Sequence, residues 1–379
     1  MNKFLPYLTN DYSVGLYNNE VNDIYHSACG ALTEAYEKFI NPLKLKDNLR
    51  VLDICYGIGY NTKALLNECI NKGYKNICID CVDIDSTLIK LSPFIKTYVN
   101  LFDRIFYKNK LYKNILNYKE ANKIINDINI HKHKSDYKIS KIVNLLLYRL
   151  LSQNFDLSIE NFITEKENFV FFDKSLLKIH KNLIEYGMQN IKNKNKSTFL
   201  HNIYYQYISK RYLNRIKEFE NQFKIKFYVQ DVRDYVKNSN LKYDIVLLDG
   251  FTPNKCPCIW SQDFFERLYE LLNDDGQLVT YNTSAVVRSA MFNAKFNVGN
   301  IKNSDDKIIG TFASKNISLI KNHLSKKQLG LLSTKAGIPF RDKNLQLSND
   351  EILSNRLHEQ NLSTLESSSK YLKRCKHEV

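Results

Sequence analysis

The sequence predicts an α/β fold with a doubly wound, mostly parallel sheet. Short apolar runs without polar alternation, at residues 50–55, 77–83 and 243–248, are typical of strands covered on both faces. Turns and helical segments alternate with these runs, as in parallel βαβ units. A chain of 379 residues with 44% hydrophobic residues can also bury a core of the size that this fold needs.

The predicted elements follow one another in the order of such a sheet. They are a strand at 50–55, a glycine turn at 56–62 with a helix to Ile70, strands at 77–83, 226–230 and 243–248, a helix at 263–272, a turn at 273–276 and a strand at 277–281. Three of these strands are closed by a carboxylate, namely Asp83, Asp231 and Asp249. The carboxyl ends of parallel strands form the ligand-binding edge of such sheets, so these acids mark a candidate site.

A long segment separates the second and third predicted strands, where a crossover needs only a dozen or so residues. It contains few glycines and prolines, and its apolar residues recur at helical spacing. We therefore expect residues 1–85 and 226–316 to form two parts of one α/β domain. Residues 86–225 are expected to be a basic, mainly helical insertion, and residues 317–379 a basic C-terminal tail.

Positive charge is concentrated outside the predicted α/β domain. Residues 86–226 contain 26 Lys and Arg against 12 Asp and Glu, and residues 311–379 contain 12 against 6. The rest of the chain is slightly acidic, whereas the whole chain carries +15. This segregation favours contact with a polyanion such as nucleic acid, with compositional drift toward Lys as the alternative.

The eight cysteines lack both a C-x-x-C pair and the spacing of a disulfide framework, which is typical of reduced thiols in a cytoplasmic protein. Cys256 and Cys258 are too close in sequence for a usual zinc knuckle, so we expect no metal. No stretch reads as a secretory signal or reaches membrane-spanning length, so we expect no membrane contact.

The segment LLDGFTPNKCPCIW, residues 247–260, is the strongest functional signal. It places Asp249 at the exit of an apolar strand, followed at once by Gly250 and Phe251 and closed by the only tryptophan, Trp260. Such an arrangement is typical of a ligand site, although Asp-Gly is also an ordinary turn pair. We expect Trp260 to belong to the core, with stacking on a substrate base as the alternative.

The glycine turn in DICYGIGYNT lacks the third glycine of a dinucleotide fingerprint, since position 62 is Thr. Asp53 followed by Gly57 and Gly59 instead resembles the glycine motif of class I methyltransferases, with Cys55 where that motif often has another glycine. This resemblance implies S-adenosylmethionine as the cofactor. Asp83 would then accept the ribose hydroxyls and Asp231 the adenine amino group, although each acid alone is more often a helix cap.

The segment LDGFTPNKCPCIW resembles the signature of the methyltransferase half of MnmC-type tRNA modification enzymes. Similar stretches occur at residues 280–296, 310–316 and 329–342, with Cys256 and Lys295 as departures where the family has Asn and Gly. The resemblance implies a Rossmann-like class I methyltransferase, here expected to be free-standing because no second glycine fingerprint occurs.

The resemblance also implies an activity, namely methyl transfer to the aminomethyl nitrogen of wobble 5-aminomethyl(-2-thio)uridine in tRNA. Asp249 would be catalytic, and Tyr56, Tyr60 and Phe251 would wall the transfer zone. The cofactor-binding residues implied are Asp53, Gly57, Gly59, Asn61, Asp83 and Asp231, and the substrate-binding residues are Phe251, Lys255 and Arg288. The implied partners are the anticodon arm of tRNA and a separate enzyme that makes the aminomethyl precursor.

Two other functions remain open at the level of the sequence. Transfer of a methyl or aminopropyl group to a polyamine would also need acids around an amine, although it would not need the positive charge elsewhere in the chain. A non-catalytic RNA-binding protein could retain the fold, but the acids at 53, 83, 231 and 249 argue against a retired site.

Overall fold

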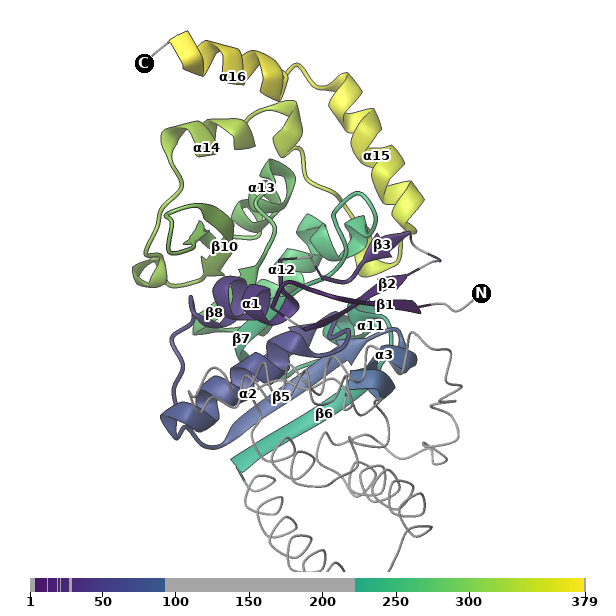
Figure 1. Cartoon of the computed structure of the whole chain (residues 1–379). Coiled ribbons are helices and arrows are strands. Elements are labelled where there is room, and N and C mark those ends of the chain that lie inside the picture. Colours follow the sequence, from purple (N-terminus) through teal and green to yellow (C-terminus); the bar gives the residue numbers. More distant parts are fainter. Residues whose placement is uncertain are drawn as a thin grey trace, which may run out of the picture. The chain divides into compact units, whose positions relative to one another are not determined.

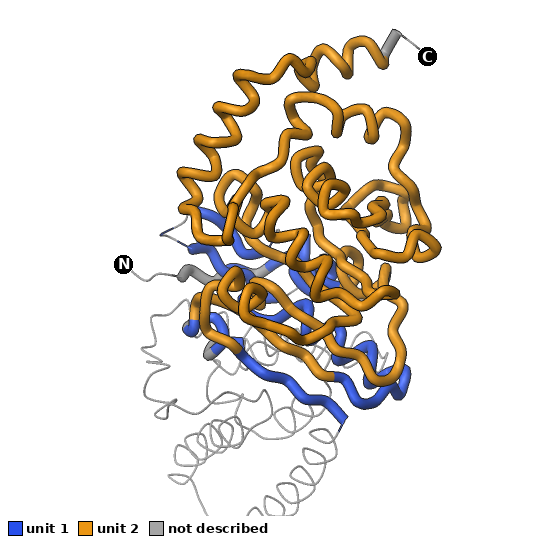
Figure 2. The backbone as a smooth tube through the Cα atoms, turned by 180° about the vertical axis from the view of Figure 1, so that it is seen from behind, with its two compact units in different colours: residues 1–35, 57–77, 86–227 blue, residues 36–56, 78–85, 228–379 orange. Residues whose placement is uncertain are grey.

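The computed structural model describes residues 4–11, 13–18, 20, 22–26, 29–92 and 222–377. Most of the predicted helical insertion therefore lies outside the described residues. The chain divides into two compact units, residues 1–35, 57–77 and 86–227 (unit 1) and residues 36–56, 78–85 and 228–379 (unit 2), which are coloured separately in Figure 2. No helix among the described residues is long and apolar enough to cross a membrane.

Unit 1 contains a small antiparallel sheet that the sequence analysis did not predict. Its strands are β1 (Phe4–Leu8), β2 (Val14–Asn18) and β3 (Asp23–Ile24), in the order β1-β2-β3. The helices of this unit are α1 (Ala31–Glu34), α2 (Tyr60–Lys72) and α3 (Ser86–Leu91). The hydroxyl of the buried Tyr60 donates to the carbonyl of Val14 at 3.1 Å and accepts from its N–H at 2.8 Å, so α2 is tied to β2.

The main sheet has seven strands in the order β6-β5-β4-β7-β8-β10-β9 (Figure 1). The strands are β4 (Arg50–Ile54), β5 (Ile77–Asp83), β6 (Phe223–Val229), β7 (Tyr243–Leu248), β8 (Leu272–Thr280), β9 (Asn297–Lys302) and β10 (Ile308–Ser314). β4 pairs in parallel with β5 and β7, and β7 with β8, whereas β10 runs antiparallel to both of its neighbours. The strand order reverses at the β4–β7 pair, which is where ligands bind in such sheets.

The predicted strands at 77–83 and 243–248 have the predicted bounds, and the class I methyltransferase fold is confirmed. The predicted turn at 273–276 is wrong, because these residues belong to β8. α12 (Gln262–Leu271) ends at an extended residue, Leu272, and passes directly into the strand. β8 has more residues than β7 over this stretch, and a register shift accommodates them. Tyr243 pairs with Leu272, whereas Ile245 pairs with Gln277.

Helices of unit 2 bury the apolar residues of its strands. α11 (Val232–Asn238), α12 and α13 (Ala285–Asn293) contribute buried residues to one core together with β4, β7 and β8. The side chain of Ser261 caps α12 by accepting from the N–H of Phe264. Before β4, residues Ala35–Ile40 form a π-helical segment, η1.

The expected basic tail is a folded part of unit 2. Its elements are η4 (Ile317–Leu319), α14 (Lys326–Leu332), η5 (Lys335–Gly337), η6 (Lys343–Leu345), α15 (Asn349–Leu362) and α16 (Ser368–His377). Phe340, Leu345 and Ile352 are buried in the core of the unit. The carboxylate of Asp263, in α12, also accepts two hydrogen bonds from the guanidinium of Arg341. Basic residues of this segment thus lie on a folded surface.

Candidate active site at the carboxyl ends of the parallel strands

The parallel register aligns three residues in one row at the ends of β5, β4 and β7. Ile54 pairs with Val82 on one side and with Leu248 on the other. The next residue on each strand gives the row Asp83, Cys55 and Asp249. Because adjacent strands lie about 4.8 Å apart, both carboxylates are neighbours of the cysteine.

Cys55 adopts a backbone conformation that usually belongs to glycine, with φ 61°. Burial raises the pKa of its thiol well above the ordinary value, and the charges of Asp83, Asp249, Cys258 and Asp53 raise it further. The thiol is therefore neutral near pH 7. It lies within the field of three carboxylates, so this end of the sheet favours a cationic ligand.

The acids differ in how deeply they are buried. Asp53 is fully buried, whereas Asp83 and Asp249 are half-buried at the rim of the sheet. The carboxylate of Asp83 accepts from the N–H of Asp85 at 2.8 Å. Asp249 donates its own N–H to the carbonyl of Ile54 at 3.3 Å, which fixes the backbone from which its carboxylate projects.

Two side-chain donors hold the loop that follows Asp249. The Trp260 indole donates to the carbonyl of Phe251 at 2.8 Å, and the Tyr281 hydroxyl donates to the carbonyl of Gly250 at 2.9 Å. Trp260 is fully buried and meets Tyr281 edge to face. The structure thus places Trp260 in the core, where it positions the loop instead of stacking on a base.

Gly250 allows this loop to pack closely against the glycine-like turn of Cys55. A Cβ at position 250 would come within 2.1 Å of Ile259 Cδ1 and within 3.2 Å of Cys55 Sγ. Phe251 is half-buried beside this close contact, and Lys255 is exposed at the tip of the loop. The loop therefore presents Asp249 and Phe251 on a firmly supported backbone.

In unit 1, the glycine turn has the backbone that the motif requires. Gly57 and Gly59 both have positive φ, at 57° and 84°, and Gly59 is the N-terminal cap residue of α2. Asn61 is buried in the first turn of the helix. The buried Lys63, which the sequence analysis missed, donates to the carbonyls of Ile58 at 3.1 Å and Ser92 at 2.6 Å.

Two residues have surroundings that differ from the expected ones. Tyr60 holds β2 through its hydroxyl, so a position in the wall of a transfer zone is not supported. Asp231 caps α11, accepting from the N–H of Arg233 at 2.8 Å, and its carboxylate pairs with the Arg233 guanidinium. Burial raises the pKa of Asp231, but the hydrogen bonds from Arg233 outweigh it and hold the pKa below its ordinary value. In the structure, Asp231 therefore acts as the helix cap that was the alternative to an adenine contact.

Arg288 lies in the interior, so direct contact with a substrate phosphate is not supported. Its side chain donates to Thr311 Oγ1 and Asn300 Oδ1, each at 2.9 Å. Burial lowers its pKa to about 10, which still leaves the guanidinium charged at neutral pH. This burial could not be predicted from the sequence, because an arginine in a short helix is usually exposed.

The sulfur atoms of Cys256 and Cys258 lie 3.6 Å apart. The hydrogen bond between the two thiols raises the pKa of Cys256 and lowers that of Cys258, which also lies near the Arg233 cation. Within the described part of the chain, no group of three or more His, Cys, Asp and Glu side chains is arranged to hold a metal ion.

The donor set in unit 2 fits S-adenosylmethionine. Carboxylates at the rim suit the hydroxyl and amino groups of a nucleoside and the charge of a sulfonium. Of the acids expected to hold the cofactor in this unit, Asp83 is half-buried at the rim, whereas Asp53 is fully buried and Asp231 is paired with Arg233.

Comparisons with known proteins give a family model, relatives and a shared fold. Residues 177–316 match the family model described as S-adenosyl-L-methionine-dependent methyltransferase. A protein of Methanocaldococcus jannaschii is 24% identical over 92% of this chain and 70% of its own length. The tRNA 5-methylaminomethyl-2-thiouridine biosynthesis bifunctional protein MnmC of Campylobacter fetus is 27% identical over 24% of this chain, a match that spans only 15% of that protein.

The crystal structure of MnmC2 from Aquifex aeolicus superimposes with a TM-score of 0.57 at 18% identity, covering 95% of this chain and 86% of that one. The family model, the shared fold and the matched segments lead to one conclusion. This chain is an S-adenosylmethionine-dependent methyltransferase with the class I fold, and its matched segments are similar to those of MnmC proteins.

Proposed function

We propose that this methyltransferase acts on the wobble uridine of tRNA, methylating the aminomethyl nitrogen of 5-aminomethyl(-2-thio)uridine to give 5-methylaminomethyl(-2-thio)uridine. The observation that carries the proposal is the row Asp83, Cys55 and Asp249, which places two carboxylates beside one neutral thiol at the switch point of the sheet. The name of the Campylobacter relative, with its matched segment, supports the choice of substrate.

The chemistry that this site must perform is removal of a proton. A primary amine is mostly protonated near neutral pH and cannot attack a methyl group until it loses one proton. Asp249 is the proposed acceptor of that proton, because its carboxylate is half-buried at the strand end and its backbone is fixed by the bond to Ile54. S-adenosylmethionine supplies an electrophilic methyl group bonded to sulfur.

The other residues orient the reactants. Phe251 offers an apolar surface beside Asp249, and excluding water there would strengthen the attraction between the carboxylate and an ammonium. Lys255, exposed on the same loop, is proposed to meet the RNA backbone. Gly57, Gly59 and Asn61 are proposed to contact the cofactor because of their place in the glycine motif.

The proposal has two biological requirements. A separate enzyme must supply the aminomethyl group on uridine, and both enzymes must work where tRNA is found, in the cytoplasm. The anticodon arm is proposed to bind the basic surfaces of the chain, so that affinity for tRNA should fall steeply with salt.

The test is methyl transfer with labelled S-adenosylmethionine to three acceptors: tRNA carrying 5-aminomethyluridine, the same tRNA without the aminomethyl group, and spermidine. We expect label only in the first, and mass analysis should locate it on the wobble nucleoside. Label in spermidine would instead identify a polyamine methyltransferase, and equal label in both tRNAs would exclude the aminomethyl nitrogen as acceptor.

A further inference from the structure

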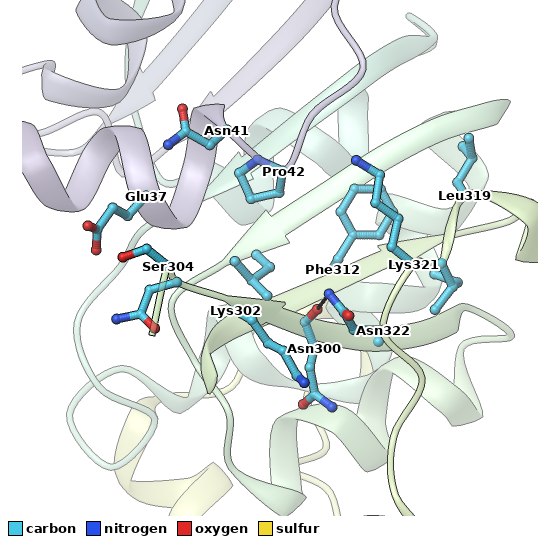
Figure 3. Close-up of a pocket in the computed structure, with 14 residues that line it drawn as sticks. Glu37, Asn41, Pro42, Asn300, Lys302, Ser304, Phe312, Leu319, Lys321 and Asn322 are labelled. Atoms are coloured by element: carbon cyan, nitrogen blue, oxygen red, sulfur yellow. Dashed lines mark hydrogen bonds between the residues drawn. The ribbon is translucent and has the colours of Figure 1, made fainter. Parts of the chain in front are cut away.

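A pocket of about 300 Å³ lies at the opposite edge of the main sheet from β6, within unit 2 (Figure 3). One side of it is formed by η1 and the residues that follow it. The other sides are formed by β9, β10 and the segment between η4 and α14. Its lining residues are Glu37, Asn41, Pro42, Gly299–Ser304, Phe312 and Leu319–Asn322.

The strand register connects this pocket with the end of β7, which Asp249 follows, through one row of paired residues across the sheet. Leu248 pairs with Thr280, Thr280 with Thr311, and Thr311 with Asn300. Three strand spacings, roughly 14–15 Å, separate the end of β7 from that of β9. A few nucleotides of RNA span this distance, since stacked nucleotides rise about 3.4 Å each.

The rim of the pocket combines one cation with one carboxylate. Lys321 is exposed and has no ion pair among the described residues, whereas Lys302 is held by Asp306 at 2.8 Å. Glu37 is half-buried on the η1 side, and Asn41 is exposed next to it (Figure 3). A lysine is suited to a phosphate, and a carboxylate is suited to the amino group of a base.

A buried positive charge lies on the other face of β9 and β10, since the Asn300 and Thr311 side chains that bind it alternate with Ile301 and Phe312. The guanidinium of Arg288 donates to the side-chain oxygen of Asn300, a lining residue, at 2.9 Å. It also donates to the Thr311 hydroxyl and the Gly310 carbonyl, which are neutral as well. With no carboxylate bound to it among the described residues, this cation gives the pocket a positive field that attracts anions.

The floor of the pocket is apolar. Ile301 and Phe312 are buried side chains that line it. Pro42, which follows η1, also lines it and is drawn with Phe312 in Figure 3. An apolar floor with an aromatic edge suits the face of a planar base, whereas a small inorganic anion would gain nothing from it. The pocket thus has the volume and the apolar floor that suit a base, an acceptor for an amino group, and a cation for a phosphate. Together these features match one nucleotide.

We propose that this pocket binds one unpaired nucleotide of the RNA substrate, a few nucleotides from the methylated uridine. Lys321 meets a phosphate, and Glu37 accepts from an amino group on the base. Adenine, cytosine and guanine carry such a group and uracil does not, so the pocket prefers those three. This inference rests on the proposed function for its RNA substrate, but it concerns a separate site.

The first test is binding of a fluorescent anticodon stem-loop RNA to the full chain. Lys321→Glu should weaken binding about tenfold or more and reduce the salt slope. The matched control is Lys307→Glu, which makes the same charge change on an exposed lysine outside the lining. Equal losses in both variants would show diffuse attraction and overturn the pocket.

The second test uses Glu37→Gln and RNAs in which single loop nucleotides are replaced by uridine. Wild-type protein should lose affinity at one such position, and the variant should lose less there, since glutamine no longer favours an amino group alone. Photocrosslinks from that nucleotide should map to residues 299–304 or 319–322. Crosslinks confined to other peptides would contradict the proposal.

The two proposals fail in different ways. If tRNA is methylated but Lys321→Glu leaves KM unchanged, the pocket inference is wrong and the function stands. If RNA crosslinks to the pocket but its wobble uridine receives no methyl group, the proposed function is wrong and the binding site stands.

Discussion

The parallel and antiparallel halves of the main sheet carry groups of opposite charge near the ends of their strands. At the ends of β4, β5 and β7, three carboxylates surround the neutral thiol of Cys55. At β9 and β10, the buried Arg288 cation lies on the other face of the strands from a pocket with Lys321 at its rim. The first half is suited to cationic groups and the second to a phosphate.

On the proposed function, this difference allows one sheet to bind a substrate that is anionic as a whole but cationic where it reacts. A pocket with uniform negative charge would repel the RNA backbone, and one with uniform positive charge would repel the ammonium. Separation by about three strands resolves the conflict.

The largest expected effect is that of Asp249→Asn on turnover. Loss of the proton acceptor should lower kcat by about 10²–10⁴-fold, while the affinities for S-adenosylmethionine and for RNA change by less than about threefold. Single-turnover methyl transfer and separate binding titrations measure these quantities. Asp274→Asn, on an exposed aspartate of β8, is the control and should be active. An active Asp249→Asn enzyme would remove the carboxylate from the reaction.

The next largest effect concerns the support of the Asp249 loop. Gly250→Ala would press its Cβ into Ile259 Cδ1 and should cost about 1–3 kcal/mol of unfolding free energy. Ile259→Val removes that same carbon atom, at a cost of about 0.5–1.5 kcal/mol on its own. The double variant should therefore lose less unfolding free energy than the sum of the losses in the two single variants. Denaturant unfolding of all three variants measures these losses. Additive costs would mean that the clash is absorbed elsewhere.

The parallel half of the sheet could be predicted from the sequence because its strands are apolar runs. β5 and β7 have the predicted bounds, and the strand-end acids Asp83 and Asp249 follow from them. The turn at 273–276 could not be predicted correctly. Asn, Asp and Gly are turn residues locally, but pairing of β8 with β7 and β10 overrides that preference.

The antiparallel half was harder to predict. Arg288 was expected at the substrate, because the sequence does not show that a helical arginine reaches into the sheet. The pocket depends on residues far apart along the chain, such as Glu37 and Asn300, which are 263 positions apart and which no local pattern connects. Its chemistry became visible only when the register of β9 and β10 was known.

A smaller effect is expected from Arg288→Gln. Removing the buried charge should weaken RNA binding about threefold to tenfold, because the positive field at the pocket is lost. Stability should change little, since lost hydrogen bonds are offset by relief from burying a charge. RNA titration at two salt concentrations and thermal unfolding measure both. Unchanged RNA affinity with lower stability would mean that Arg288 serves packing alone, and the comparison of the two halves would lose its electrostatic basis.

The smallest effects are expected at two positions where glycine would be usual. Cys55 has φ 61° and Lys295 has φ 72°, and Lys295 follows α13 where helices commonly end on glycine. Lys295→Gly should raise the unfolding free energy by about 0.5–1 kcal/mol, because relief of the left-handed strain exceeds the added entropy of the unfolded chain. Methyl transfer should not change. Cys55→Gly relieves the same strain but removes a buried sulfur between the carboxylates, so it should gain less stability and alter the affinity for S-adenosylmethionine. Equal behaviour of the two variants in unfolding and cofactor titrations would show that the thiol has no part in the site.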